Sequence, residues 1–205
     1  LVCNSQNAAD MWAQHRPALI KKARVIYNPV VIPEYEVEPK PPHDNRRRLV
    51  VAATYSALKN PVLLVQAVAS LNDADRSRLR VDWFGRREVT SGDPSVFDMT
   101  FDLIERFGLV DTITLHEETH SIYDEMVSAD VVGLFSEYEG LPNAICEGMS
   151  LGKPIIMTAV SDHRVLIDER NGFLCKTTDI DGIADALRSM LATDCSYLAA
   201  MGEES

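Results

Sequence analysis

Residues 131–147 read Val131-Val132-Gly133-Leu134-Phe135-Ser136-Glu137-Tyr138-Glu139-Gly140-Leu141-Pro142-Asn143-Ala144-Ile145-Cys146-Glu147. The first five residues form an apolar run with the length and composition of a buried strand. Pro142 suits the first position of a helix, because it lacks the N–H that a helix start leaves unpaired. The stretch therefore predicts a strand, a turn and a helix, with Glu139 in the turn and Glu147 in the helix, separated by seven residues.

The turn between the two glutamates has the features needed to bind a phosphorylated ligand. A helix N-terminus carries unpaired N–H donors and about half a positive charge, so it holds phosphate. Helical side chains lean toward the N-terminus, so we expect Glu147 to face back toward the turn. A carboxylate can also accept two hydrogen bonds from a ribose diol. The pattern predicts a nucleotide-sugar site at this helix start.

Strands and helices alternate along most of the remaining chain. Apolar runs predict strands at 49–53, 79–84, 112–115, 131–135, 154–158 and 172–175. The clearest helix is predicted at 61–71, with Asn60 as its N-cap, and further helices follow Asp98 and Asp179. This alternation predicts an α/β fold with a Rossmann-like doubly wound parallel sheet, whose ligands sit at the carboxyl ends of the strands. The loops 54–60 and 139–147 both follow strands in this way.

The proline distribution divides the chain into four parts. Five of the ten prolines lie at positions 29–42, just before the basic run Arg46-Arg47-Arg48, and this is the composition of a linker. We expect a remnant of another unit at 1–28, with a strand at 1–3, a helix at 7–19 and a strand at 24–27. A Pro-rich linker at 29–47, a Rossmann-like domain at 48–193 and a truncated helical tail at 194–205 follow. The three arginines are interpreted as the solvated end of the linker.

Composition excludes several classes of protein. The net charge of −11 argues against nucleic-acid and anionic-membrane surfaces, which need a basic footprint. No stretch reaches membrane-spanning length, and the chain begins with Leu1 rather than Met, so we expect further chain upstream. The four cysteines show no close pairing, which predicts reduced thiols and a cytoplasmic location.

Three motifs carry a resemblance to a known family. They are the stretch 136–147 with its continuation Met149, Gly152, Lys153, Pro154 and Ile155, the stretch Leu49 to Asn60, and the segment Val25-Ile26-Tyr27-Asn28-Pro29-Val30. Together they make the chain similar to the C-terminal, donor-binding domain of the retaining glycosyltransferases of group 1, family 4. The resemblance covers essentially the whole chain and implies one half of a GT-B fold.

The resemblance also implies roles for individual residues. Glu139 and Lys59 would be the catalytic pair, with Glu139 near the transferred sugar and Lys59 on the donor diphosphate. The implied donor-binding residues are Glu147, Gly140, Leu141, Pro142, Asn143, Thr54 and Ser56, with Glu147 on the ribose.

The implied reaction is hexosyl transfer with retention, from a nucleotide-diphosphate sugar to a glycan or lipid-linked acceptor held by the N-terminal domain. The implied setting is polysaccharide or cell-surface glycan biosynthesis. We expect no metal and no cofactor, and we expect this stretch of chain alone to transfer nothing.

Two departures from the family pattern keep other functions open. Ala53-Thr54 stands where the family has Gly-Arg, so one cation for the diphosphate is absent, and Arg86 or Arg87 is a candidate replacement. Ser161-Asp162-His163 stands where the family often has Gly-Gly. The alternatives are a nucleotide-sugar-binding module without catalysis and a sugar-nucleotide epimerase, although the latter class lacks the two-glutamate signature.

The histidines have weaker candidate roles. His116, His120 and His163 fit no zinc spacing, and no carboxylate is an obvious partner for any of them in the sequence, so they are interpreted as loop residues. His116-Glu117 occupies the position where the family's nucleotide base packs, which makes contact with the base a second interpretation.

Overall fold

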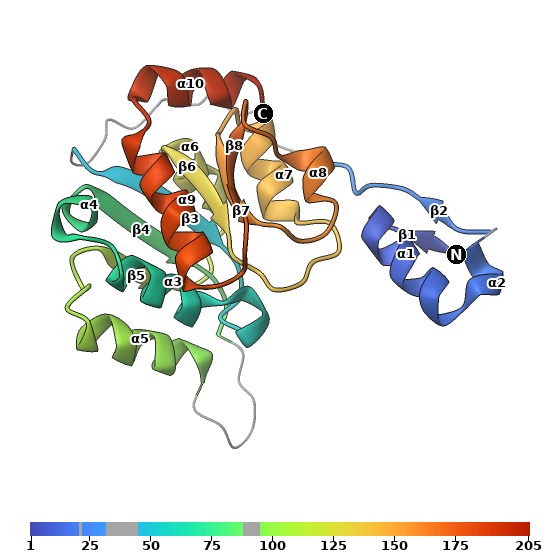
Figure 1. Cartoon of the computed structure of the whole chain (residues 1–205), viewed down its shortest axis with the longest axis horizontal. Coiled ribbons are helices and arrows are strands. Elements are labelled where there is room, and N and C mark those ends of the chain that lie inside the picture. Colours follow the sequence, from blue (N-terminus) through green and yellow to red (C-terminus); the bar gives the residue numbers. More distant parts are fainter. Residues whose placement is uncertain (21, 32–44, 88–94) are drawn as a thin grey trace.

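The computed structural model describes residues 1–20, 22–31, 45–87 and 95–205. Most of the predicted linker lies outside them, so the proposed division into domains stays a prediction. The main unit is a six-stranded parallel sheet flanked by helices, and a small N-terminal unit lies to one side of it (Figure 1). The sequence-based prediction of an α/β Rossmann-like fold is confirmed.

The sheet has the strand order β5-β4-β3-β6-β7-β8, and every pairing is parallel. Its strands are β3 (Arg47–Ala52), β4 (Leu79–Phe84), β5 (Ile113–His116), β6 (Val131–Leu134), β7 (Ile155–Thr158) and β8 (Gly172–Cys175). All six strands were predicted, with ends that differ by at most two residues. Their order was not predicted, because a strand's own pattern does not specify its neighbours.

The helices cover both faces of the sheet. They are α3 (Pro61–Ala69), α4 (Asp73–Ser77), α5 (Val96–Arg106), α6 (Ile122–Val127), α7 (Asn143–Ser150), α8 (His163–Leu166), α9 (Ile180–Ala192) and α10 (Cys195–Glu203). Side chains alternate along each strand, so Val51 packs under α3, α5 and α9, whereas Val50 packs with residues of α6 and α7. None of the helices in the described ranges combines the length and the apolar character needed to traverse a bilayer.

The N-terminal unit is a strand-helix-strand piece. The strands β1 (Val2–Cys3) and β2 (Arg24–Val25) pair in parallel, and α1 (Gln6–His15) and α2 (Pro17–Ile20) connect them. The prediction of one continuous helix at 7–19 is wrong. The first helix ends at His15, and its C-cap Arg16 has a non-helical backbone (φ −142°, ψ 73°), because a residue before a proline is pushed out of the helical region.

Asn60 is the N-cap residue of α3, as predicted, but it does not cap the helix through its side chain. Asn60 has a left-handed backbone (φ 58°, ψ 42°) at the end of the short 3₁₀ helix η1 (Ala57–Lys59). Its side chain makes no capping bond. Instead, Asn60 Nδ2 donates to the carbonyl of Phe135 at 3.0 Å, so the side chain ties the start of α3 to the end of β6.

Candidate functional site

The two loops singled out from the sequence meet at the point where the sheet changes direction. From β3 the chain continues outward through β4 and β5, whereas from β6 it continues outward through β7 and β8 on the other side. β3 and β6 are neighbours, so the loops after them, residues 53–60 and 135–142, meet at the switch point, where parallel α/β sheets bind ligands outside the carboxyl ends of their strands. The region between these two loops is the crevice.

Backbone and side-chain bonds hold the two loops together. The N–H of Glu137 donates to the carbonyl of Leu58 at 2.9 Å. Thr158 at the end of β7 donates its hydroxyl to the carbonyl of Ser136 at 2.6 Å. The loop after β6 is thereby fixed from both neighbouring strands, which gives the crevice a defined shape.

Lys59 and Glu139 form an ion pair across the crevice. The Lys59 ammonium contacts Glu139 Oε1, and Ser136 Oγ donates to the same oxygen at 2.6 Å. The side chains of Lys59 and Glu139 are only 22% and 11% exposed, so water screens this pair less than it screens a surface pair. The structure thus brings the two predicted catalytic residues together, with Ser136 as a third member that the sequence did not single out for a role.

The start of α7 presents free backbone donors beside this pair. Pro142 precedes the helix as its N-cap rather than occupying its first turn, which corrects its predicted position by one residue. The N–H groups of Gly140, Leu141, Asn143 and Ala144 donate to no acceptor among the described residues. Adjacent unpaired amides at a helix N-terminus suit an anion such as phosphate.

Glu147 lies one turn along α7 in a half-buried position. Burial raises the pKa of its carboxyl above the ordinary value, because desolvation disfavours the charged form. Its charge acts on Tyr123 of α6, whose pKa is raised first by burial and then by Glu147. Within the described part of the chain its carboxylate has no hydrogen-bond or ion-pair partner, so both oxygens are open to a ligand's hydroxyl groups.

A buried aromatic side chain holds the loop after β3 in place. Tyr55 is buried, and its hydroxyl oxygen lies 2.8 and 2.7 Å from the carbonyls of Trp83 and His116, between which its single proton is shared. Gly85 passes so close to this loop that a Cβ there would lie 1.9 Å from the carbonyl oxygen of Ala53. Thr54 is half-buried and Ser56 is 8% exposed. These contacts hold both predicted donor-binding residues at the crevice end of β3.

Arg87, one of the two candidates for the missing cation, is engaged elsewhere. Its guanidinium forms an ion pair with Glu117 at 2.8 Å and lies 3.6 Å from the centre of the Phe97 ring. Phe97 belongs to α5 and lies edge-on to Tyr55 of the loop after β3, with ring centres 4.8 Å apart, and Arg87 pairs with Tyr55 in a β-bridge. Arg87 thus lies beside the loop after β3, where its guanidinium is already engaged by Glu117 and Phe97.

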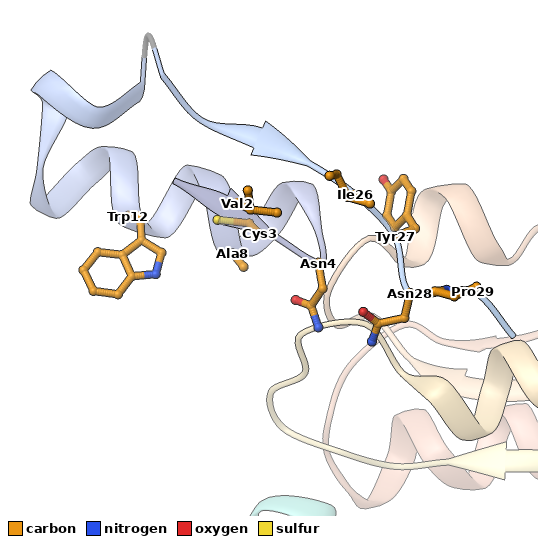
Figure 2. A pocket seen from close by; sticks show the side chains of 9 residues that line it. All are labelled: Val2, Cys3, Asn4, Ala8, Trp12, Ile26, Tyr27, Asn28 and Pro29. Atoms are coloured by element: carbon orange, nitrogen blue, oxygen red, sulfur yellow. The ribbon is translucent and has the colours of Figure 1, made fainter.

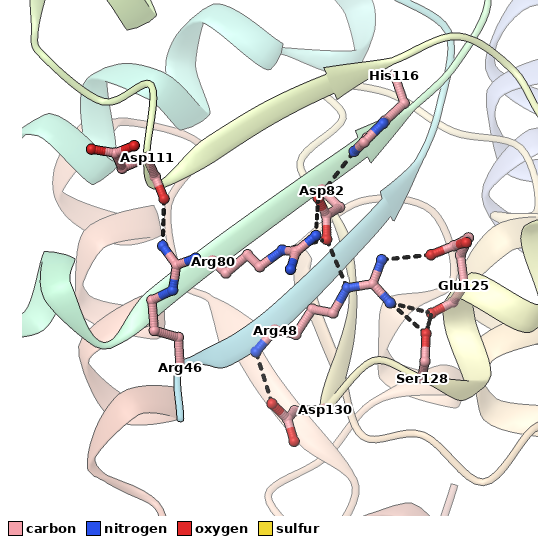
Figure 3. A network of polar contacts seen from close by, with 9 residues as sticks. All are labelled: Arg46, Arg48, Arg80, Asp82, Asp111, His116, Glu125, Ser128 and Asp130. Carbon is pink, nitrogen blue, oxygen red and sulfur yellow. Dashed lines mark hydrogen bonds and ion pairs between the residues drawn. The ribbon is translucent and has the colours of Figure 1, made fainter. Parts of the chain in front are cut away.

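Two sequence-based interpretations are corrected by a buried network on β3, β4 and β5 (Figure 3). Arg48 is not a solvated linker end, because it lies within β3 with its side chain 10% exposed. It donates to Asp82 Oδ2 at 2.7 Å and to Glu125 Oε2 at 2.6 Å. His116 also has a carboxylate partner, since its Nε2 lies 3.0 Å from Asp82 Oδ1. An ionised carboxylate only accepts hydrogen bonds, so this ring nitrogen carries the proton.

Asp82 is the centre of this network, and the sequence held a signal for it. It is a fully buried aspartate in β4, where Arg80 is the other charged residue, and buried charges are almost always paired. Burial opposes its ionisation, but hydrogen bonds from His116, Arg48 and Arg80 outweigh that effect and hold its pKa well below the usual range. The His116 ring also stacks on Phe84, with ring centres 4.3 Å apart and planes 9° apart.

The reactivity of the four cysteine thiols tests which of them are buried. All four are unpaired, and only Cys195 is exposed. Burial raises the pKa of the Cys175 thiol to about 12 and also raises that of Cys146. With a colorimetric disulfide reagent at pH 8, we expect one fast-reacting equivalent in the native protein and the remaining three only after unfolding. A Cys195→Ser variant that still shows the fast equivalent contradicts this assignment.

A cavity of about 530 Å³ is lined by residues of the N-terminal segment 2–29 (Figure 2). Apolar side chains, including those of Val2, Trp12 and Ile26, form part of its wall. The side chains of Asn4 and Asn28 point from it toward the loop between β6 and α7 (Figure 2). The N-terminal unit therefore borders the candidate site.

The chain was compared with known proteins. Residues 34–205 match the family described as glycosyl transferases group 1. A curated relative, the Escherichia coli UDP-Gal:alpha-D-GlcNAc-diphosphoundecaprenol alpha-1,3-galactosyltransferase, is 39% identical over 61 residues, which are 29% of this chain and 16% of that protein.

Solved structures share the fold. Anabaena Alr3699/HepE in complex with UDP and glucose superposes with a TM-score of 0.79 at 19% identity, over 98% of this chain and 55% of that one. WaaG, a glycosyltransferase involved in lipopolysaccharide biosynthesis, superposes with a TM-score of 0.81 at 16% identity, over 99% and 56%. The chain spans about half the length of these structural relatives. By its family match it belongs to the group 1 glycosyl transferases, and its sheet is one Rossmann-like half of a GT-B fold.

Proposed function

We propose that the crevice between the loops after β3 and β6 binds the diphosphate and sugar of a nucleotide-sugar donor. The observation that carries this proposal is the convergence of Lys59, Glu139 and the free amides at the start of α7 at the switch point of the sheet. A cation and unpaired backbone donors complement a diphosphate. An ammonium has three donors, so Lys59 can hold a phosphate oxygen while keeping one bond to Glu139.

The proposed reaction is transfer of a hexose with retention of configuration. The bond from the anomeric carbon to the diphosphate breaks, a bond to an acceptor hydroxyl forms, and the hydroxyl proton leaves with the diphosphate. Lys59 and the amides of Asn143 and Ala144 stabilise the charge that grows on the leaving group. Glu139 orients the sugar, and Glu147 accepts hydrogen bonds from the ribose.

The comparisons support a uridine nucleotide as the probe for this site. The Anabaena structure holds UDP and glucose, and the name of the Escherichia coli relative specifies UDP-galactose as donor and a lipid diphosphate as acceptor. We propose a glycan or lipid-linked acceptor for this protein as well, in the synthesis of a polysaccharide or cell-surface glycan. The proposed location is the cytoplasm, and no cofactor is proposed.

Titration calorimetry with UDP tests the ribose assignment. We expect Glu147→Ala to weaken UDP binding about tenfold, because a hydrogen bond to a charged group contributes about 1.5–3 kcal/mol. Glu105→Ala, at an exposed position of α5, serves as the control and should bind UDP as the unaltered chain does. Equal affinity in the Glu147→Ala variant would exclude Glu147 from the ribose site.

A binding module without catalysis is the second candidate function. Thr54 replaces an expected arginine, the Arg87 guanidinium is engaged with Glu117 and Phe97, and Arg86 is exposed. The site thus has fewer committed cations for the diphosphate than the family pattern implies. Product analysis with the full-length protein, several UDP-sugars and glycan acceptors separates the candidates. A glycosylated acceptor supports the transferase, whereas binding without turnover supports the module.

A further inference from the structure

Asp162 holds the N-terminal unit against the main domain. Its carboxylate accepts hydrogen bonds from the N–H groups of Gln6 at 2.6 Å and Asn7 at 2.8 Å, which are the first two residues of α1. Ser5 caps the next free amide, that of Ala8, at 3.1 Å. The start of α1 is thus satisfied by a carboxylate from a distant part of the chain, and a negative charge is favourable at a helix N-terminus.

The same carboxylate holds the other end of the N-terminal unit. The hydroxyl of Tyr27, two residues after β2, donates to Asp162 Oδ2 at 2.8 Å. This hydrogen bond is the main reason that the pKa of Tyr27 is raised. Asp162 is 8% exposed and has no lysine or arginine partner among the residues that the structure describes. Its charge is therefore compensated by donors of the N-terminal unit.

The residue before Asp162 touches the candidate site. Ser161 has a left-handed backbone (φ 53°), which is a strained conformation for a residue other than glycine. Its hydroxyl donates to the carbonyl of Gly140 in the turn after β6. The loop 160–162 thus contacts the N-terminal unit through Asp162 and the donor turn through Ser161.

The N-terminal unit also contacts the turn directly. Asn28 Nδ2 donates to Asn143 Oδ1 at 3.2 Å, and Tyr138 donates to the sulfur of Met11 at 3.4 Å. Asn4 lies so close to Gly140 that a Cβ on that glycine would be 3.1 Å from Asn4 Oδ1. The position of the turn therefore depends on the position of the N-terminal unit.

We propose that Asp162 is a positioning residue that clasps the N-terminal unit to the donor turn, so that ligand binding at the turn and docking of the unit are coupled. The coupling to a ligand rests on the proposed function, because it requires that the turn bind a nucleotide diphosphate. The contact that Asp162 makes between the N-terminal unit and the turn does not depend on that function. Coupling between two sites is reciprocal, so a clasp that helps UDP bind must in turn be tightened by UDP by the same factor.

Hydrogen exchange measured by mass spectrometry tests the clasp without any ligand. In an Asp162→Ala variant we expect exchange at the start of α1 to accelerate about tenfold, as for the loss of an N-cap, and exchange of residues 138–144 to accelerate as well. The matched control is Asp194→Ala, which removes the N-cap of α10, where Asp194 accepts from Tyr197 at 2.7 Å. That control should leave the exchange of α1 and the turn unchanged.

Calorimetry and exchange with UDP test the coupling. We expect Asp162→Ala to weaken UDP binding several-fold, and UDP to slow exchange of α1 in the unaltered chain but not in the variant. If α1 loosens while the turn and the UDP affinity are unchanged, Asp162 is only a local cap and the proposal is overturned. If UDP does not bind even the unaltered chain, the proposed function is wrong. The role of Asp162 in holding the turn is then tested by the hydrogen exchange of residues 138–144 measured without ligand.

A variant that removes a single hydrogen bond tests the proposal even if Asp162→Ala fails to fold. Tyr27→Phe removes a single hydroxyl, and we expect it to accelerate exchange in the same two regions by a smaller factor than Asp162→Ala. Circular dichroism during heating confirms that each variant is folded before it is compared. An unchanged turn in a folded Tyr27→Phe variant, together with an unfolded Asp162→Ala variant, also counts against the clasp.

Discussion

Replacing Asp82 with alanine is expected to lower the free energy of unfolding by about 3–5 kcal/mol, because it removes the carboxylate that two arginines and a histidine share in a buried network. Arg48, with 10% of its side chain exposed, loses its 2.7 Å bond to Asp82, and Arg80 loses its 3.0 Å bond to the same carboxylate. For a domain of this size, such a loss lowers the melting temperature by roughly 10 °C. Thermal and urea unfolding followed by circular dichroism measure both quantities.

A surface pair supplies the control for Asp82. Asp185→Ala breaks the pair of Asp185 with Arg188, whose side chains are 76% and 44% exposed, and it should cost no more than about 1 kcal/mol. An Asp82→Ala variant as stable as Asp185→Ala would show that the network contributes little.

The contribution of Asp82 should also depend on pH. Its pKa is lowered in the folded protein, so its stabilising effect is complete above the pKa of the unfolded chain, about 3.9, and is lost as the pH falls toward the lower, folded pKa. The difference in stability between the Asp82→Ala variant and the unaltered chain should therefore shrink below about pH 4.

Replacing Lys59 with alanine is expected to weaken UDP binding by about ten- to a hundredfold. A charge-assisted contact with the diphosphate contributes about 1.5–3 kcal/mol. The variant also leaves Glu139, with 11% of its side chain exposed, without its cation, and an unpaired carboxylate beside the diphosphate is repulsive. Calorimetry with UDP measures the affinity, and the unfolding curve reports any loss of stability.

A second lysine variant controls for net charge. Lys176→Ala removes an exposed lysine that follows β8, at the edge of the sheet opposite β5, and it should bind UDP as the unaltered chain does. If Lys59→Ala and Lys176→Ala bind UDP equally well, Lys59 does not contact the diphosphate. Uridine, which has no phosphate, should bind the Lys59→Ala variant and the unaltered chain with equal affinity.

The elements of this fold were predictable because their signals are local. Apolar runs located all six strands of the main sheet, and the alternation of strands with helices predicted parallel pairing. Details of local geometry were missed. Asn60 is the N-cap residue of α3 as predicted, but its side chain bonds to Phe135, and Pro17 breaks the helix predicted at 7–19.

The two loops of the candidate site were predictable from the sequence, but the contact between them was not. The loops around Lys59 and Glu139 were identified from their motifs, and both follow strands. Their contact was not predictable from spacing, since 80 residues separate the two side chains. It depends on β3 lying beside β6, which is a property of the sheet order.

The sequence by itself determined the order of strands and helices and the two loops that carry the candidate chemistry, because backbone preference and apolar periodicity act over a few residues. Only the tertiary structure decided which polar groups meet. Arg48 bonds to Asp82, which lies 34 positions away in the sequence, and Asp162 bonds to the start of α1, about 156 positions away. A pattern of polar and apolar residues specifies what is buried, but the partner of a buried charge depends on how distant segments pack.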